Sequence, residues 1–204
     1  MTTVEFFFDY SSPWTYLAFD RIEEVCTETG AELVWKPFLV GGVFNKVNPS
    51  VYQRRENPVP PKDAYYRKDM HDWARYQGLT IGKPSVFPVN SVKALRGAFV
   101  AIEAGKISDY SREVFKAYWT DDKDISQDDV LRSIVESVGM DSRDFFQKIA
   151  APDWKQKLFD TTDELIARGG FGSPTMFVDK DDMYFGNDRL ELMRYAIEQK
   201  KKAA

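Results

Sequence analysis

Strand-forming segments are expected only near the two ends of the chain, and this placement limits the folds that the chain can adopt. Residues 4–8 form a short aromatic and β-branched run, and residues 32–40 form a second apolar run before two glycines. Both have the composition of strands. Between them, Ser12-Pro13 is typical of a helix start, because serine is a favoured N-cap and proline suits the first helical position. The order predicts a βαβ unit with parallel strands.

The C-terminal end carries two further strand candidates. Residues 175–178 and 183–185 are short apolar runs joined by the acidic turn 179–182, and a helical pattern follows from Asp188. Because so short a connection suits a hairpin, the two strands are expected to be antiparallel neighbours. This end of the chain therefore predicts a ββα unit.

The middle of the chain has mostly helical periodicity, after a segment at 48–61 that is rich in Pro, Asn and Arg and is expected to be irregular. Helices are expected at residues 63–77, 91–104, 110–120, 127–138, 142–150 and 154–168. The whole pattern predicts an α/β protein with a thioredoxin fold and an inserted all-helical subdomain. The expected parts are the N-terminal βαβ portion at 1–50, the helical insert at 51–160 and the C-terminal ββα portion at 161–204.

Charge and hydropathy exclude several classes of partner. The chain carries 28 basic and 32 acidic residues, a net charge of −4, and they are interleaved rather than gathered in a basic stripe for nucleic acid. No apolar run approaches the roughly 18 residues that span a bilayer. Residues 1–9 lack the basic start and apolar stretch of a signal peptide. We expect a cytoplasmic protein without nucleic-acid or membrane partners.

The scarcity of cysteine and histidine limits the chemistry. Cys26 is the only cysteine and His71 the only histidine, so an intrachain disulfide and a CxxC redox pair are excluded, and no metal site is expected. Cys26 falls on the apolar stripe of the first expected helix, which predicts a core residue rather than a nucleophile. We interpret His71 as a structural or surface residue.

Several motifs resemble one enzyme family along nearly the whole chain. The segment 6–18, FFFDYSSPWTYLA, is similar to the opening of the 2-hydroxychromene-2-carboxylate isomerases and kappa-class glutathione transferases, which have DsbA-like thioredoxin folds. Further matches in order are KPFLVGGVF at 36–44, Lys62, Tyr65, Asp69, Phe87-Pro88, Asn90-Ser91, Ala94-Leu95-Arg96, GSPTMFV at 172–178 and FGNDRL at 185–190. The resemblance implies a homodimeric enzyme that works with glutathione and a small aromatic or electrophilic substrate.

Ser12 is the central residue of this interpretation. Taken alone, it is most simply a helix N-cap. The resemblance implies that it also donates a hydrogen bond to the sulfur of bound glutathione, where redox relatives have their first cysteine. Thr15 takes the second cysteine position, so Ser12 and Thr15 cannot cycle through a disulfide. The hydroxyl and the helix N-terminus together would lower the pKa of a thiol from about 8.5 to between roughly 5.5 and 7.

The resemblance also implies where the rest of glutathione binds. Pro174, which on its own could be an ordinary trans proline at a strand start, would follow a cis peptide bond, and Ser173 would hold the cysteinyl part through its backbone. Asn187 and Asp188, otherwise a helix cap, would hold the γ-glutamyl group. Lys62 and Asn48 are candidates for the glycine carboxylate, although a solvated lysine is the simpler interpretation of Lys62.

Other side chains have weaker interpretations. Arg54, Arg55 and Arg96 could meet an acidic substrate, but surface or structural pairing is favoured. Trp14, Tyr16, Phe44 and Tyr65 are candidates for an aromatic substrate wall, although core packing explains most aromatic residues.

Three hypotheses for the function follow. The first is a glutathione-dependent cis–trans isomerase of the 2-hydroxychromene-2-carboxylate type, in which the thiolate adds reversibly to a conjugated aromatic keto acid. The second is a kappa-like transferase or peroxidase acting on other electrophiles. The third is a thioredoxin-like binding domain that has no redox cysteines. Consumption of glutathione separates the first two.

Overall fold

The computed structural model describes residues 1–203 and contains one mixed four-stranded sheet in the order β2-β1-β3-β4. The strands are β1 (Thr3–Phe8), β2 (Glu32–Pro37), β3 (Thr175–Val178) and β4 (Asp182–Phe185). β1 is parallel to β2 and antiparallel to β3, and β3 and β4 form the hairpin. The βαβ and ββα units predicted from the two ends of the sequence are therefore confirmed. The second strand was expected to reach residue 40, but it ends at Pro37, and Val40 begins a helix that was not predicted.

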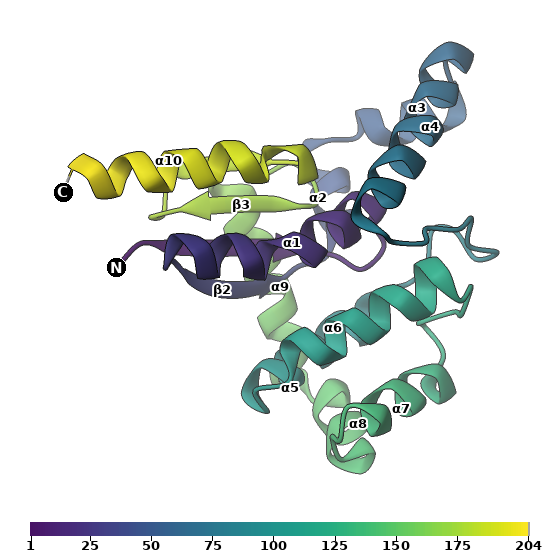
Figure 1. Cartoon of the computed structure of the whole chain (residues 1–204). Coiled ribbons are helices and arrows are strands. Elements are labelled where there is room, and N and C mark those ends of the chain that lie inside the picture. The colour runs from purple at the N-terminus through teal and green to yellow at the C-terminus, as the bar shows by residue number, and fades with distance from the viewer. Residues whose placement is uncertain (204) are drawn as a thin grey trace.

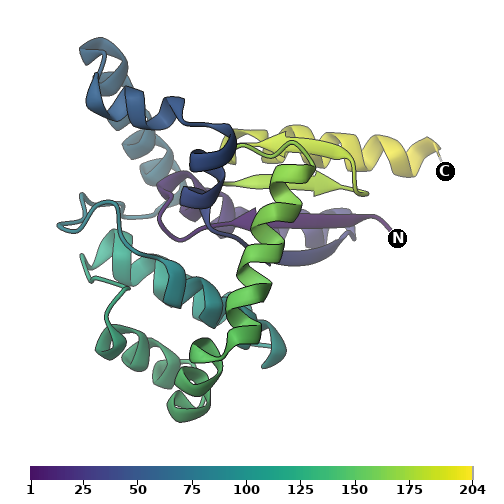
Figure 2. The same cartoon turned by 180° about the vertical axis from the view of Figure 1, so that it is seen from behind.

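Helices cover both faces of the sheet. α1 (Pro13–Thr29) and α10 (Leu190–Ala203) pack side by side on one face, with η2 (Asn187–Arg189), a 3₁₀ turn, leading into α10 (Figure 1). α9 (Pro152–Ala167) crosses behind the sheet, where it contacts α2 (Val40–Val47) (Figure 2). This is the layering of a thioredoxin fold.

The alternation of side chains along β1 divides the core between these two faces. Phe6 and Phe8 are fully buried in the large cluster that includes residues of α1 and α10. Phe7 points to the other face, where it packs with Phe38 and Phe177 in a smaller cluster. Because successive strand residues face opposite sides, an uninterrupted aromatic run identifies a strand buried on both faces.

The remaining helices lie beside the sheet and beyond one end of it, and together form the helical layer (Figure 1). They are α3 (Ser50–Glu56), α4 (Pro60–Gln77), α5 (Val92–Glu103), α6 (Ile107–Phe115), the π-helical segment η1 (Lys116–Thr120), α7 (Asp128–Ser137) and α8 (Ser142–Ala150). The helices predicted from periodicity are confirmed apart from shifts of a few residues at their ends. Within residues 1–203, no helix combines the length and apolar character needed to cross a membrane.

The expectation that residues 48–61 are irregular is wrong. α3 lies within this segment and projects together with α4 from one end of the molecule (Figure 1). Pro49 stands at the N-cap of α3, and Pro60 begins α4. Proline is tolerated at such starts because a first-turn N–H has no helical partner. The prolines mark where these helices begin rather than preventing them.

α9 links the helical layer to the sheet. It contacts α5 and α8 as well as α2 and β2. The boundary expected between residues 160 and 161 falls inside this helix. The division of the chain into 1–50, 51–160 and 161–204 stays a prediction.

Candidate active site

Ser12 stands at the start of α1, directly after the turn that leaves β1. Its backbone is extended, with φ −107° and ψ 121°, and its Oγ accepts a hydrogen bond from the Thr15 N–H at 3.3 Å. Pro13 occupies the first helical position. The hydroxyl therefore lies at the positive end of a 17-residue helix, where negative charge is stabilised.

The loop before β3 faces Ser12. The Ser173–Pro174 peptide bond is cis, as expected. The Ser12 hydroxyl donates to the Ser173 carbonyl oxygen at 3.1 Å, and the hydroxyls of Thr15 and Ser173 lie 2.7 Å apart. The hydroxyls of Ser12 and Thr15 thus contact the same residue of the opposite loop.

Asp9 precedes this turn and is fully buried, and its role could not be predicted from the motif that contains it. Its Oδ1 accepts the Ser11 N–H and its Oδ2 accepts the Val40 N–H, each at 2.9 Å. Burial raises the pKa of the Asp9 carboxyl, while the N–H groups of Ser11 and Val40 oppose that rise. Asp9 joins the Ser12 turn to the start of α2.

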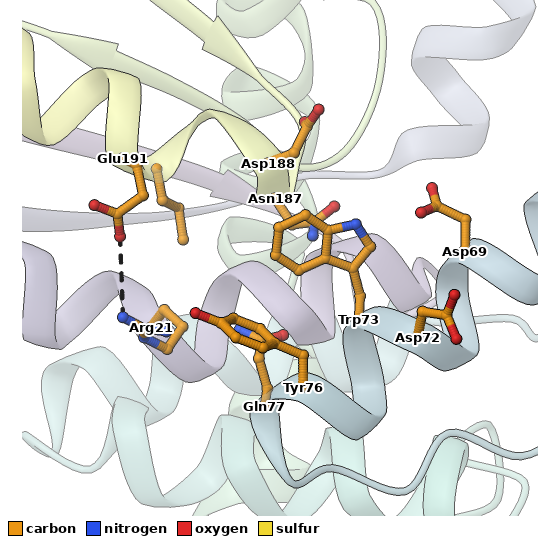
Figure 3. A pocket seen from close by; sticks show the side chains of 10 residues that line it. Arg21, Asp69, Asp72, Trp73, Tyr76, Gln77, Asn187, Asp188 and Glu191 are labelled. Carbon is orange, nitrogen blue, oxygen red and sulfur yellow. Dashed lines mark ion pairs between the residues drawn. The ribbon is translucent and has the colours of Figure 1, made fainter.

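A pocket of about 340 Å³ lies between α1, α4 and the turn that begins α10 (Figure 3). The predicted residues Asn187 and Asp188 form part of its lining. Arg21 of α1 and Glu191 of α10 close one end, with 4.0 Å between the Arg21 Nη2 and the Glu191 Oε1. The rest of the lining comes from α4 and from the start of α10, namely Asp69, Asp72, Trp73, Tyr76, Gln77 and Leu190.

Two buried polar atoms among the lining residues have no hydrogen-bond partner within the described chain. They are the Nδ2 of Asn187, whose residue is only 8% exposed, and the Oε1 of Gln77. A buried polar group without a partner is unfavourable. One unpaired donor and one unpaired acceptor around the same pocket suit a ligand that carries both kinds of group. Gln77 could not be recognised from the sequence, because only the fold brings it opposite Asn187.

The two candidates for the glycine end of glutathione have different surroundings. Asn48 follows α2 and donates from Nδ2 to the Phe171 carbonyl oxygen at 3.1 Å, which places it beside the loop that carries Ser173. Lys62 lies exposed in the first turn of α4, and residues 1–203 provide it with no hydrogen bond or ion pair. The fold thus brings Asn48, but not Lys62, into contact with that loop.

The structural interpretations of the remaining candidates agree with their surroundings. Arg96 donates to the Ile149 carbonyl oxygen in the last turn of α8. Arg54 lies over the ring of Tyr66, 3.6 Å from its centroid, and Arg55 lies near Phe87. Cys26 is buried, as predicted.

These features define a class: a thioredoxin-fold protein with hydroxyl side chains at the start of its first helix, beside a cis-proline loop. The chain belongs to the DSBA-like thioredoxin domain family, whose sequence model matches residues 3–198.

Its relatives are enzymes, and so is this chain. It is 25% identical to a 2-hydroxychromene-2-carboxylate isomerase of Sphingobium xenophagum, over 94% of this chain and 95% of the relative. It is also 25% identical to human glutathione S-transferase kappa 1, over 97% and 91% of the two chains. A solved structure of a 2-hydroxychromene-2-carboxylate isomerase superposes with a TM-score of 0.82 at 24% identity, covering 98% of this chain and 97% of that one. The recognition of the family from its motifs is therefore confirmed.

Proposed function

We propose that the protein is a glutathione-dependent cis–trans isomerase of the 2-hydroxychromene-2-carboxylate type, acting on a conjugated aromatic keto acid. The observation that carries the proposal is the placement of Ser12, whose hydroxyl lies at the N-terminus of α1 against the loop of Ser173 and Pro174. This arrangement can stabilise a thiolate but cannot form a disulfide. The thiol must therefore come from a bound molecule.

The residues around Ser12 fit glutathione. Ser173 would bind its cysteinyl part, and Asn48 with Lys62 its glycine carboxylate. Asn187, Asp188 and Gln77 would bind the γ-glutamyl head group, whose carboxylate matches the unpaired Asn187 Nδ2 and whose ammonium matches the unpaired Gln77 Oε1. The fit rests on these unpaired atoms as well as on the family motifs.

Ser12 and Ser173 would exchange hydrogen bonds when glutathione binds. The Ser12 hydroxyl now donates to the Ser173 carbonyl oxygen. If that carbonyl accepts the cysteinyl N–H instead, the hydroxyl is free to donate to the sulfur. A hydrogen bond to a charged acceptor contributes about 1.5–3 kcal/mol, and the helix N-terminus about 0.3–1 kcal/mol. When bound, glutathione supplies a thiolate that adds reversibly to the conjugated double bond.

A kappa-like transferase or peroxidase is the second candidate. The sequence similarity supports it, because the chain is 25% identical to human glutathione S-transferase kappa 1 and also 25% identical to the Sphingobium isomerase. The two candidates share the Ser12 site and differ in whether glutathione is consumed. A homodimer, a small aromatic or electrophilic substrate and a cytoplasmic location complete the proposal.

Calorimetric titration of glutathione tests the binding step, and a turnover assay with 2-hydroxychromene-2-carboxylate tests the reaction. We expect saturable binding, and isomerisation without loss of glutathione. Loss of glutathione in proportion to product would favour the transferase, and an absence of binding at millimolar concentration would contradict both candidates.

A variant of the pocket tests the head-group assignment. Gln77→Leu removes the unpaired acceptor, and we expect binding to weaken about ten- to hundredfold, the effect of one hydrogen bond to a charged group. Gln156→Leu, on the exposed side of α9, is the matched control and should bind like the wild type. Equal affinity of the Gln77 variant and the wild type would contradict the assignment.

A further inference from the structure

Asp9 is a buried carboxylate that the proposed chemistry does not use. It lies one residue beyond β1, is fully buried, and faces backbone N–H groups where a buried carboxylate usually has a cation. Burial is the larger cause of the raised pKa of Tyr10 and of Tyr118, and Asp9 adds to the rise in both. Burial of a carboxyl group is unfavourable unless its oxygens accept hydrogen bonds, so the partners of Asp9 indicate what this residue does.

The contacts of Asp9 join three segments of the site. Its Oδ1 holds the Ser11 N–H, one residue before Ser12. Its Oδ2 holds the Val40 N–H at the start of α2. Its own N–H donates to the Ser173 Oγ at 3.0 Å, on the loop that accepts the Ser12 hydroxyl.

α2 depends on Asp9 for its N-terminal cap. The N-cap residue of α2 is Leu39, which has no side-chain group to accept a helical N–H. The Asp9 carboxylate takes this role from a position 31 residues away in the sequence. The other end of α2 leads to Asn48, whose amide contacts the Phe171 carbonyl oxygen. The one carboxyl group thus accepts hydrogen bonds both from the turn before Ser12 and from the start of the helix that leads to Asn48.

We propose that Asp9 is a positioning residue of the thiol site, which fixes Ser12 relative to α2 and to the loop of Ser173. This inference rests on the proposed function and extends it to a residue that does not touch the ligand. A misplacement of about 1 Å at a reacting centre can lower the rate of the reaction about a hundredfold, so the placement of Ser12 matters to the chemistry.

The substitution Asp9→Asn is a test in which the loss of charge and the loss of positioning change the affinity for glutathione in opposite directions. The amide keeps the shape of the carboxyl, but its NH₂ group faces one of the two N–H donors and cannot accept from it. At a pH where Asp9 is ionised, removing its negative charge would by itself strengthen the binding of glutathione, which is an anion. We expect calorimetry well below the unfolding temperature to show binding at least about tenfold weaker. Unchanged or tighter binding, with or without lower stability, would overturn the proposal.

A double variant separates positioning from simple capping of α2. Leu39→Thr supplies a local cap in the background of Asp9→Asn, so it should recover stability of α2. If Asp9 positions Ser12, the double variant still binds glutathione at least about tenfold more weakly than the wild type. Recovery of wild-type affinity would mean that Asp9 only caps the helix, and would overturn the proposal. Asp141→Asn, at the N-cap of α8, is the matched control and should leave affinity unchanged.

A measurement on the protein alone keeps this inference separate from the proposed function. In the Asp9→Asn variant, amide hydrogen exchange should be faster than in the wild type at whichever of Ser11 and Val40 faces the new NH₂ group. If the wild type binds no glutathione, the proposed function fails, and exchange then decides the role of Asp9 by itself. Faster exchange at one or both of these amides would support it, and unchanged exchange at both would overturn it.

Discussion

At the scale of single residues, burial decides which ionisable groups can take part in chemistry. Cys26 is 3% exposed, and burial, with a smaller effect of Glu23, raises the pKa of its thiol to about 12. The reactive form of a cysteine is the thiolate. The protein's own thiol is therefore unsuited to the reaction that Ser12 is proposed to support.

The burial and the raised pKa of Cys26 predict that its thiol is unreactive in the folded protein. Iodoacetamide at about pH 8 should leave the folded protein unmodified, because the thiol is protonated and covered. After denaturation in urea, mass spectrometry should detect one added group, since the chain has one cysteine. Rapid modification of the folded protein would contradict the burial of Cys26.

The raised pKa of Asp9 predicts a pH dependence of stability. The unfolded chain ionises this group around its ordinary value of 3.8, before the folded chain does. The contribution of Asp9 to the unfolding free energy is therefore largest below that value and falls as pH rises through the raised folded-state pKa. Tyr118, whose pKa is raised to about 12 mainly by burial, stays neutral over this range, and so does Tyr10, whose pKa burial also raises.

Urea unfolding of the wild type and the Asp9→Asn variant across acidic pH isolates this effect. Asparagine does not titrate, so the stability advantage of the wild type should shrink as pH rises. An advantage that stays constant or grows would show that the pKa of Asp9 is not raised.

At the scale of helices, close packing fixes how the helical layer is built. Gly97 lies in the middle of α5, and an added Cβ would lie 2.4 Å from both the Phe145 Cζ and the Tyr110 Oη. Gly41 in α2 has open space in the same position. The neighbours of Gly97 therefore leave no room for a larger residue, whereas Gly41 has space for one.

The pair of substitutions Gly97→Ala and Gly41→Ala tests this packing. Gly97→Ala should lower the unfolding free energy by about 1–3 kcal/mol through overpacking, despite the better helix propensity of alanine. Gly41→Ala should be neutral or raise it by up to about 1 kcal/mol. Thermal unfolding followed by circular dichroism measures both, and equal effects would contradict the packing of α5 against α6 and α8.

Local patterns account for most of what the sequence predicted about these elements. Phe6, Phe7 and Phe8 identify a strand buried on both faces, and Ser12-Pro13 identifies the start of α1, because each signal lies within a few residues. α3 was missed because its sequence buries no residue and so has no apolar stripe. Asp9 and Gln77 could not be assigned roles, since their partners come from distant segments that only the fold brings together.

At the scale of the whole molecule, the sheet topology gathers the site at one end. Phe8 at the end of β1 is opposite Pro37 at the end of β2, so the two parallel strands end at the same edge of the sheet. The Ser12 turn follows β1 there, and α2 follows β2. β3 runs the other way, so its first residues, opposite Phe7, bring in the loop of Ser173 and Pro174. α4 reaches from the helical layer to complete the pocket beside Asn187 (Figure 3). Both the sheet and the helical layer contribute to the proposed glutathione site.

The central claim is that Ser12 stabilises the thiolate of bound glutathione. The most direct test is to follow the thiolate absorbance of the glutathione complex across pH for the wild type and the Ser12→Ala variant. If Ser12 has this role, the bound thiol should have a pKa between roughly 5.5 and 7 in the wild type, and this pKa should rise by about one to two units in the variant, as expected for one hydrogen bond to a charged acceptor. A bound thiol that titrates near its free value of about 8.5 in the wild type, or at the same pH in both proteins, would contradict this role.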